Sequence, residues 1–92
     1  METNVTIMRR PQVESAMGLA RSTIYKMVKL GLFTDPVPIY GRSVGWPLAE
    51  VNSINAARIA GKSDREIRDL VEKLHTARKE LYTVEMVREV QS

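Results

Sequence analysis

Two short amphipathic segments that meet at a glycine constrain the fold of this chain more than any other feature. In the first segment, Pro11 suits the opening turn of a helix, and apolar residues follow at helical spacing until Gly18. The second runs from about Arg21 to Leu30, and Gly31 suits the left-handed position that ends a helix. Because only a tight turn separates them, the pair predicts a helix-turn-helix unit.

The outer face of the second segment carries positive charge only. Ile24 and Val28 lie one turn apart and are expected to face the core. The residues that then point elsewhere are three cations, a hydroxyl and a phenol: Arg21, Ser22, Tyr25, Lys26 and Lys29. An ordinary solvated face mixes both signs, so this face is expected to meet a polyanion such as double-stranded DNA.

A β-hairpin is predicted after this unit. Pro36 and Pro38 exclude a helix, the stretches 37–40 and 43–46 favour extended chain, and Gly41 with Arg42 supplies the turn. A hairpin that follows a recognition helix is a wing, whose basic tip reaches backbone phosphates or the minor groove. Arg42 is the candidate contact, and a solvated turn arginine is its alternative.

Two further helices are predicted beyond the hairpin. Pro47 begins the first, an amphipathic helix that ends near Gly61 and whose expected inner face is Leu48, Val51, Ile54, Ala57 and Ile59. Trp46, the one tryptophan, is expected in the core, with stacking on a base as the alternative. The second helix begins at Ser63, which forms a capping box with Glu66.

The apolar stripe of this last helix has two interpretations. It consists of Ile67, Leu70, Val71, Leu74 and Leu81. A narrow stripe on a long helix is typical of a dimer seam, and packing on the chain's own domain explains it equally well. Residues 83–90 fit either a helix or a strand, and we favour a short helix. The expected organisation is a DNA-binding domain over 1–61 and a helical extension over 62–92.

The charge distribution agrees with this division. Residues 1–61 hold seven basic and four acidic side chains, whereas residues 62–92 hold seven of each, so the whole excess of +3 lies in the first part. The excess is typical of a polyanion-binding surface beside a neutral packing element.

Several classes of protein are disfavoured. The chain has no cysteine, no apolar leader and no run long enough to span a membrane, which favours a cytoplasmic protein. His75, the one histidine, is expected to be solvated in a charged helix. No nucleophile–base pair, metal cluster or phosphate loop is evident, so we expect neither an enzyme nor a cofactor.

Several short motifs occur in a fixed order: Arg9-Arg10, Gly18–Tyr25, Gly31-Leu32-Phe33, Gly41–Trp46 and Glu50-Val51. With them the chain resembles the AlpA family of phage and prophage regulators, relatives of MerR-type winged domains and excisionases. The resemblance implies a mainly α fold with a β-hairpin wing, a winged helix-turn-helix plus a C-terminal helical extension. It also implies a bacterial, nucleoid-associated protein that regulates transcription, directs excision, or does both. Two departures are Ala20 in place of a serine or threonine cap and Ser53 in place of a tryptophan.

The expected DNA contacts divide by role. Arg21, Ser22 and Thr23 are expected to read bases, and Tyr25 shares their face. The expected phosphate contacts are Arg9, Arg10, Tyr25, Lys26 and Lys29, and Arg42 is expected to reach a phosphate or the minor groove from the wing tip. Ser43 beside it is also expected to contact DNA. One small module gives a limited footprint, so a homodimer or cooperative oligomer on DNA is expected. An integrase or RNA polymerase is a candidate protein partner.

Two other functions remain as alternatives. One is a winged module that binds protein and oligomerises. The other is a small DNA-recognition subunit of a phage packaging terminase.

Overall fold

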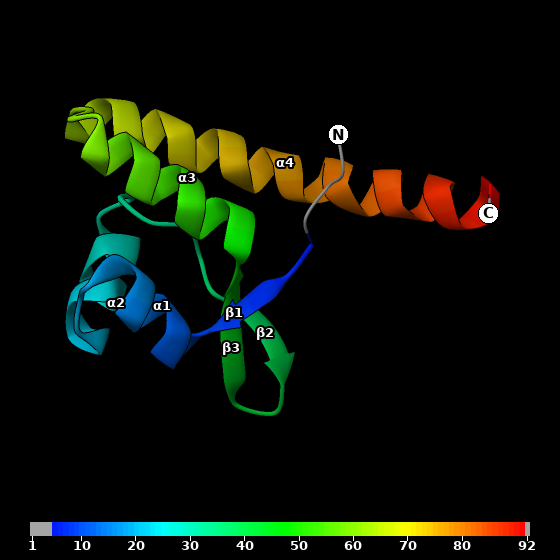
Figure 1. The fold of residues 1–92 in the computed structure, drawn as a ribbon, viewed down its shortest axis with the longest axis horizontal. Coiled ribbons are helices and arrows are strands. Elements are labelled where there is room, and N and C mark those ends of the chain that lie inside the picture. Colours follow the sequence, from blue (N-terminus) through cyan, green and yellow to red (C-terminus); the bar gives the residue numbers. More distant parts are fainter. Residues whose placement is uncertain (1–4, 92) are drawn as a thin grey trace.

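The structure is a computed structural model that describes residues 5–91, so the outermost ends of the two expected ranges, 1–4 and 92, lie outside the described residues. Its elements are β1 (Ile7–Arg9), α1 (Arg10–Met17), α2 (Arg21–Lys29), β2 (Val37–Tyr40), β3 (Ser43–Pro47), α3 (Leu48–Ile59) and α4 (Asp64–Gln91). Figure 1 shows α1 and α2 beside a small sheet, with α3 above them and α4 above α3, along the top of the molecule. The predicted winged helix-turn-helix with a helical extension is confirmed.

The helix-turn-helix forms where the glycines predicted it. Gly18 takes the left-handed conformation, with φ of 66°, and its N–H donates to the carbonyl of Glu14, which ends α1. Gly31, with φ of 74°, follows the end of α2 in the same way. Ala20 precedes α2 and offers no side-chain oxygen to cap it, as its identity implied.

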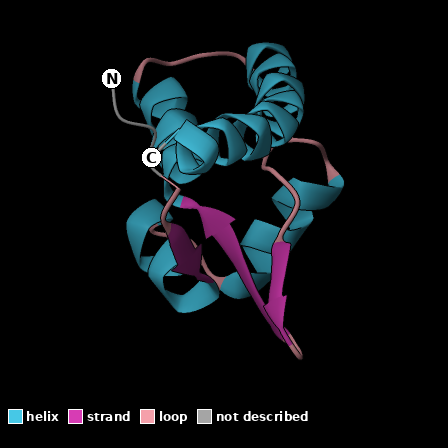
Figure 2. Cartoon of the chain, turned by 90° about the vertical axis from the view of Figure 1, so that its right-hand side faces the viewer, coloured by secondary structure: helices cyan, strands magenta, loops and turns pink. Residues whose placement is uncertain are grey.

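The sheet has three strands rather than the two of the predicted hairpin. Its order is β1-β3-β2, and both neighbours of β3 are antiparallel to it (Figure 2). No local pattern indicates β1, because three residues are too few for an alternating pattern and their partner lies far along the chain. Arg9 therefore has two positions in the fold: it is the last residue of β1, where it pairs with Gly45, and it is the N-cap of α1.

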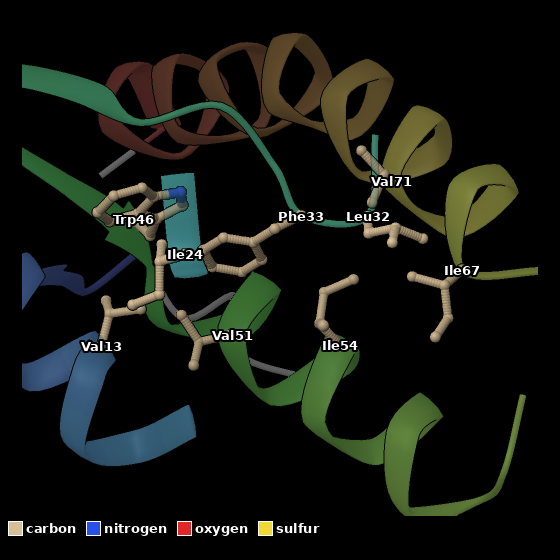
Figure 3. Close-up of a cluster of buried hydrophobic side chains, with 9 residues drawn as sticks. All are labelled: Val13, Ile24, Leu32, Phe33, Trp46, Val51, Ile54, Ile67 and Val71. Carbon is tan, nitrogen blue, oxygen red and sulfur yellow. The ribbon is translucent and has the colours of Figure 1, made fainter. Parts of the chain in front are cut away.

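The core contains residues from both ends of the chain. Figure 3 shows its nine side chains: Val13, Ile24, Leu32, Phe33, Trp46, Val51, Ile54, Ile67 and Val71. Trp46 is fully buried, as predicted, and stacks on Phe33 with ring centroids 5.5 Å apart. Its indole N–H donates to the carbonyl of Thr34 at 2.7 Å, so the polar edge is satisfied.

The inner face of α3 departs most clearly from the prediction at Ile59. Val51 and Ile54 are buried and Ala57 packs against the core, but Ile59 is 87% exposed. Ile59 lies five residues after Ile54, which turns its side chain away from the face that Ile54 and Val51 share. The prediction for Ile59 was therefore wrong.

A single helix of 28 residues forms the C-terminal part. Its capping box is present, since the Glu66 N–H donates to the Ser63 hydroxyl at 3.2 Å and the Ser63 N–H donates to the Glu66 carboxylate at 3.2 Å. Residues 83–90 are helical, as we favoured, but they continue α4 instead of forming a short separate helix.

In addition to the exposed ion pair between Asp64 and Arg58 of α3, three side chains of α4 bind it to the loop that follows α2 and to α3. Arg68 donates to the carbonyl of Leu30 at 2.9 Å. His75 accepts the backbone N–H of Asp35 at 3.0 Å, so the prediction of a merely solvated histidine was wrong. Arg78 donates to the carbonyl of Asp35 and to both carboxylate oxygens of Glu50.

Candidate nucleic-acid interface

An open groove of about 570 Å³ lies between the start of α1, the start of α2 and the wing. Its walls are Arg9, Arg10, Pro11, Gln12, Arg21, Tyr25, Arg42, Ser43 and Val44. Six of the ten residues predicted to contact DNA are therefore brought together here, from four different elements and the wing turn. We call this site the arginine groove.

The charge of the arginine groove is entirely positive among the described residues that line it. Four guanidinium groups share this small space, from Arg9, Arg10, Arg21 and Arg42. The nearest acid to Arg10 is Glu14, at 3.3 Å, one turn further along α1. Clustered cations at this density repel one another, and an anionic ligand relieves that repulsion.

Hydrogen bonds hold one wall of the groove in place. The Arg9 guanidinium donates to the Ser43 hydroxyl at 3.1 Å, which joins the end of β1 to the start of β3 beside the wing tip. The Arg9 N–H donates to the Gln12 side chain at 2.9 Å, and this bond fixes the start of α1. The hydrogen bond between Arg9 and Ser43 thus fixes the orientation of the wing relative to α1.

Tyr25 has a second role that its position in the sequence concealed. It is only partly exposed and packs against the core, with its ring edge-on to Trp46 at a centroid distance of 6.1 Å. The Arg21 guanidinium lies over the same ring, 5.8 Å from its centroid. The expectation that Tyr25 points away from the core is corrected, since Tyr25 lies between the core and the groove.

The two lysines of α2 lie on a different flank. Lys26 and Lys29 line a second shallow groove, of about 550 Å³, together with Ser22, Tyr25, Val28 and Pro36. Thr23 is exposed and borders neither groove. The structure therefore divides the predicted contacts of α2 into an arginine side and a lysine side, with Tyr25 common to both.

The stripe of α4 packs largely within its own chain. Ile67 and Val71 are buried in the core, and Leu70 and Leu74 pack against it. Leu81 lies further out, in a shallow groove beside the start of α3. Packing within the chain's own domain therefore accounts for Ile67 and Val71, because these buried side chains are not accessible to a second copy of the protein.

Gln12 and the ion pair between Glu50 and Arg78 escaped the sequence analysis. Glutamine at the third helical position is a recognised capping signal, so Gln12 was detectable. The partners of the ion pair lie 28 residues apart, and no local pattern connects them. Among residues 5–91 no helix is long and apolar enough to cross a membrane, and no group of three or more potential metal ligands occurs.

Known proteins are similar to this chain at the level of a family and of an individual relative. The profile of the family described as "Prophage CP4-57 regulatory protein (AlpA)" matches residues 6–58. The "Uncharacterized protein ORF88" of Enterobacteria phage P4 is 40% identical over 60 residues, which cover 65% of this chain and 68% of that protein. No solved structure matches the chain significantly. The matched family region contains the arginine groove and ends at the last turn of α3.

Proposed function

Because the chain belongs to the family of the prophage regulatory protein AlpA, we propose that it binds double-stranded DNA through the arginine groove and the exposed face of α2. The family is one of regulatory proteins and not of enzymes. The single observation that carries the proposal is the convergence of four arginines on one groove without an acid in its lining. A surface of this kind suits a polyanion held by several phosphates at once.

The proposed docking places the start of α2 in the major groove. Arg21, Ser22 and Thr23 lie in its first turn and are exposed, so they are the side chains that reach base edges. Arginine takes both acceptors of a guanine edge, which is worth about 1–3 kcal/mol of discrimination. Arg21 is held over Tyr25, which limits its freedom before DNA arrives.

The remaining cations position the protein on the phosphates. Arg42 at the wing tip and Arg10 at the start of α1 both line the arginine groove. Lys26 and Lys29 lie on the other side of α2, in its last turn. Their positive charges there also interact favourably with the negative end of the helix dipole. With about five cations engaged, log affinity should fall against log salt with a slope near −4 to −5.

The biological role that we propose is that of a prophage regulator. It controls transcription or directs excision of the prophage from the bacterial chromosome, with RNA polymerase or an integrase as the protein partner in each case. Both roles use the same DNA-binding surface. The packaging-terminase and protein-binding alternatives are weaker, because the family that matches is regulatory and an acid-free basic groove is an unusual surface for binding protein.

The test is binding to a pool of random duplexes by fluorescence anisotropy at two salt concentrations. We expect salt-sensitive binding that the Arg21→Ala/Lys26→Ala variant loses. The matched control is Arg65→Ala/Lys73→Ala, which removes the same charge from exposed positions on α4. If both variants lost DNA affinity equally, the effect would depend on net charge alone, and the proposed surface would be contradicted. Absence of binding by the folded wild type at micromolar concentration and low salt would overturn the function itself.

A further inference from the structure

The last turns of α4 extend beyond the rest of the molecule. Figure 1 shows the C-terminal end of this helix running past α3 and the sheet. Asp64, Arg68, His75 and Arg78, all in the first half of α4 or near its middle, bind this helix to other parts of the fold. Further on, the Thr83 hydroxyl donates to the Lys79 carbonyl and Arg88 pairs with Glu85, both within the helix. A short helix without tertiary packing is only marginally stable in water, so packing against a partner would stabilise this end of α4.

An apolar groove begins where α4 leaves the domain. It has a volume of about 300 Å³ and lies between the start of α3 and the middle of α4. Its apolar lining is Pro47, Ala49, Leu74, Ala77, Leu81 and Val84. Small residues such as Ala49 and Ala77 leave room for another helix to approach closely.

A seam continues this groove along the projecting helix. Its positions are Ala77, Leu81, Val84, Arg88 and Gln91, whose spacing alternates between four residues and three, as in a coiled coil. Val84 is 44% exposed and the neighbouring Val87 is 48% exposed. Apolar side chains in this arrangement are typical of a surface that another protein covers.

We propose that this seam binds the same seam of a second copy of the chain, with the two α4 helices antiparallel and crossing at Val84. The charges decide the orientation. Glu80 lies four residues before Val84 and Arg88 four residues after it. A parallel pair would set Glu80 against Glu80 and Arg88 against Arg88, whereas the antiparallel pair sets Glu80 of each copy level with Arg88 of the other.

The existing contacts of Arg88 do not oppose this exchange. Its ion pair with Glu85 joins two side chains that are more than a third exposed, and exposed pairs one turn apart contribute little to stability. The proposal goes beyond DNA binding, because the association involves neither the arginine groove nor DNA. Its test therefore uses the protein alone, and its failure would leave the proposed function standing.

Sedimentation velocity of the full chain without DNA measures the association. We expect a dimer at about 50 μM and a dissociation constant that rises at least about tenfold in Val84→Glu. The matched control is Met86→Glu, which introduces the same charge at a residue of similar exposure, 47%, on the opposite side of the helix. Circular dichroism establishes that both variants remain folded. A monomeric wild type, or equal weakening by the two variants, would overturn the proposal.

Charge exchange and cross-linking test the orientation. Glu80→Arg and Arg88→Glu should each weaken the dimer, and the double variant should restore it. Since the chain has no cysteine, Val84→Cys should form an intermolecular disulfide on oxidation and Gln91→Cys should not. Cross-linking of Gln91→Cys, or no recovery in the double variant, would exclude the antiparallel arrangement.

Discussion

The guanidinium group of Arg78 donates to both carboxylate oxygens of Glu50 at 2.7 Å. The same group donates to the carbonyl of Asp35 at 2.7 Å, so one side chain of α4 joins α3 to the loop that precedes the wing. Glu50 is only 5% exposed. This pair connects the α4 helix, which lies entirely outside the matched family region, to the elements that position the proposed DNA surface.

Removal of Arg78 should destabilise the fold strongly. In Arg78→Ala the carboxylate of Glu50 stays buried without its partner, and the loss of a buried partner costs about 3–5 kcal/mol. Urea unfolding followed by circular dichroism measures the change. Arg58→Ala, which removes an exposed ion pair with Asp64, is the control and should cost less than about 1 kcal/mol. Similar costs for the two variants would contradict the structural role of the Glu50–Arg78 pair.

Gly45 should tolerate no side chain. A Cβ there would lie 2.6 Å from the Met8 carbonyl oxygen and 2.6 Å from the Ile7 side chain, because β1 and β2 flank β3 closely at this point. Gly18 has open space around it, and its left-handed conformation alone costs alanine about 1–2 kcal/mol. We therefore expect Gly45→Ala to lower the unfolding free energy more than Gly18→Ala. The reverse order in urea titrations would show that the sheet accommodates the methyl group.

Thr34→Val should stabilise the protein. Thr34 is fully buried, and its hydroxyl has no hydrogen-bond partner among the described residues. An unsatisfied buried group costs about 1–3 kcal/mol, and valine has nearly the same shape without that cost. Thermal unfolding should show a higher Tm. Thr83→Val, which alters an exposed threonine, is the control and should leave Tm nearly unchanged. A lower Tm in Thr34→Val would mean that the hydroxyl is satisfied after all.

The capping box of α4 should make stability depend on acid pH. The hydrogen bond from the Ser63 N–H, aided by the Ser63 hydroxyl and the Lys62 charge, holds the pKa of Glu66 below its ordinary value of 4.5. A lowered pKa means that folding favours the carboxylate, so this contribution is complete above the ordinary pKa and is lost as pH falls through the folded value. Ser63→Ala should raise the pKa of Glu66 in an NMR titration. Lys62→Ala should raise it less, and the opposite ranking would contradict the assigned causes.

Loss of Arg42 should change the salt dependence of DNA binding. If the wing tip touches one phosphate, Arg42→Ala should reduce the slope of log affinity against log salt by about 0.9. Anisotropy titrations at several salt concentrations give this slope. Arg65→Ala on α4 serves as the control with the same change in charge, and it should leave the slope unaltered. An unchanged slope in Arg42→Ala would indicate a solvated turn arginine.

The sequence predicted those parts of the fold that depend on local signals. Gly18 and Gly31 marked the ends of two helices, and the capping box at Ser63 marked the start of the last one. The three residues of β1 were missed because their strand character comes from pairing with β3, which lies far along the chain, for example at Gly45 opposite Arg9. Ile59 was misplaced because helical periodicity was continued past the point where the core ends.

The sequence predicted which residues belong to the candidate site better than it predicted how they are arranged. Arginines at the start of α1, at the start of α2 and in the wing turn suggested a common ligand. Their meeting in one groove depends on the sheet register that sets Arg9 opposite Gly45. The half-buried position of Tyr25 depends on Trp46, which lies 21 residues further along the chain. Contacts of this kind arise from tertiary packing, and periodicity alone does not encode them.

The position of Trp46 gives the protein an intrinsic optical signal. This single tryptophan contacts Tyr25, and the ring of Tyr25 also carries the Arg21 guanidinium, which lines the arginine groove. A ligand that draws Arg21 away from the ring changes the local electric field at the indole, while the indole itself stays dry. Occupancy of the groove is therefore expected to shift the emission of the unlabelled protein, which makes every titration readable without a dye.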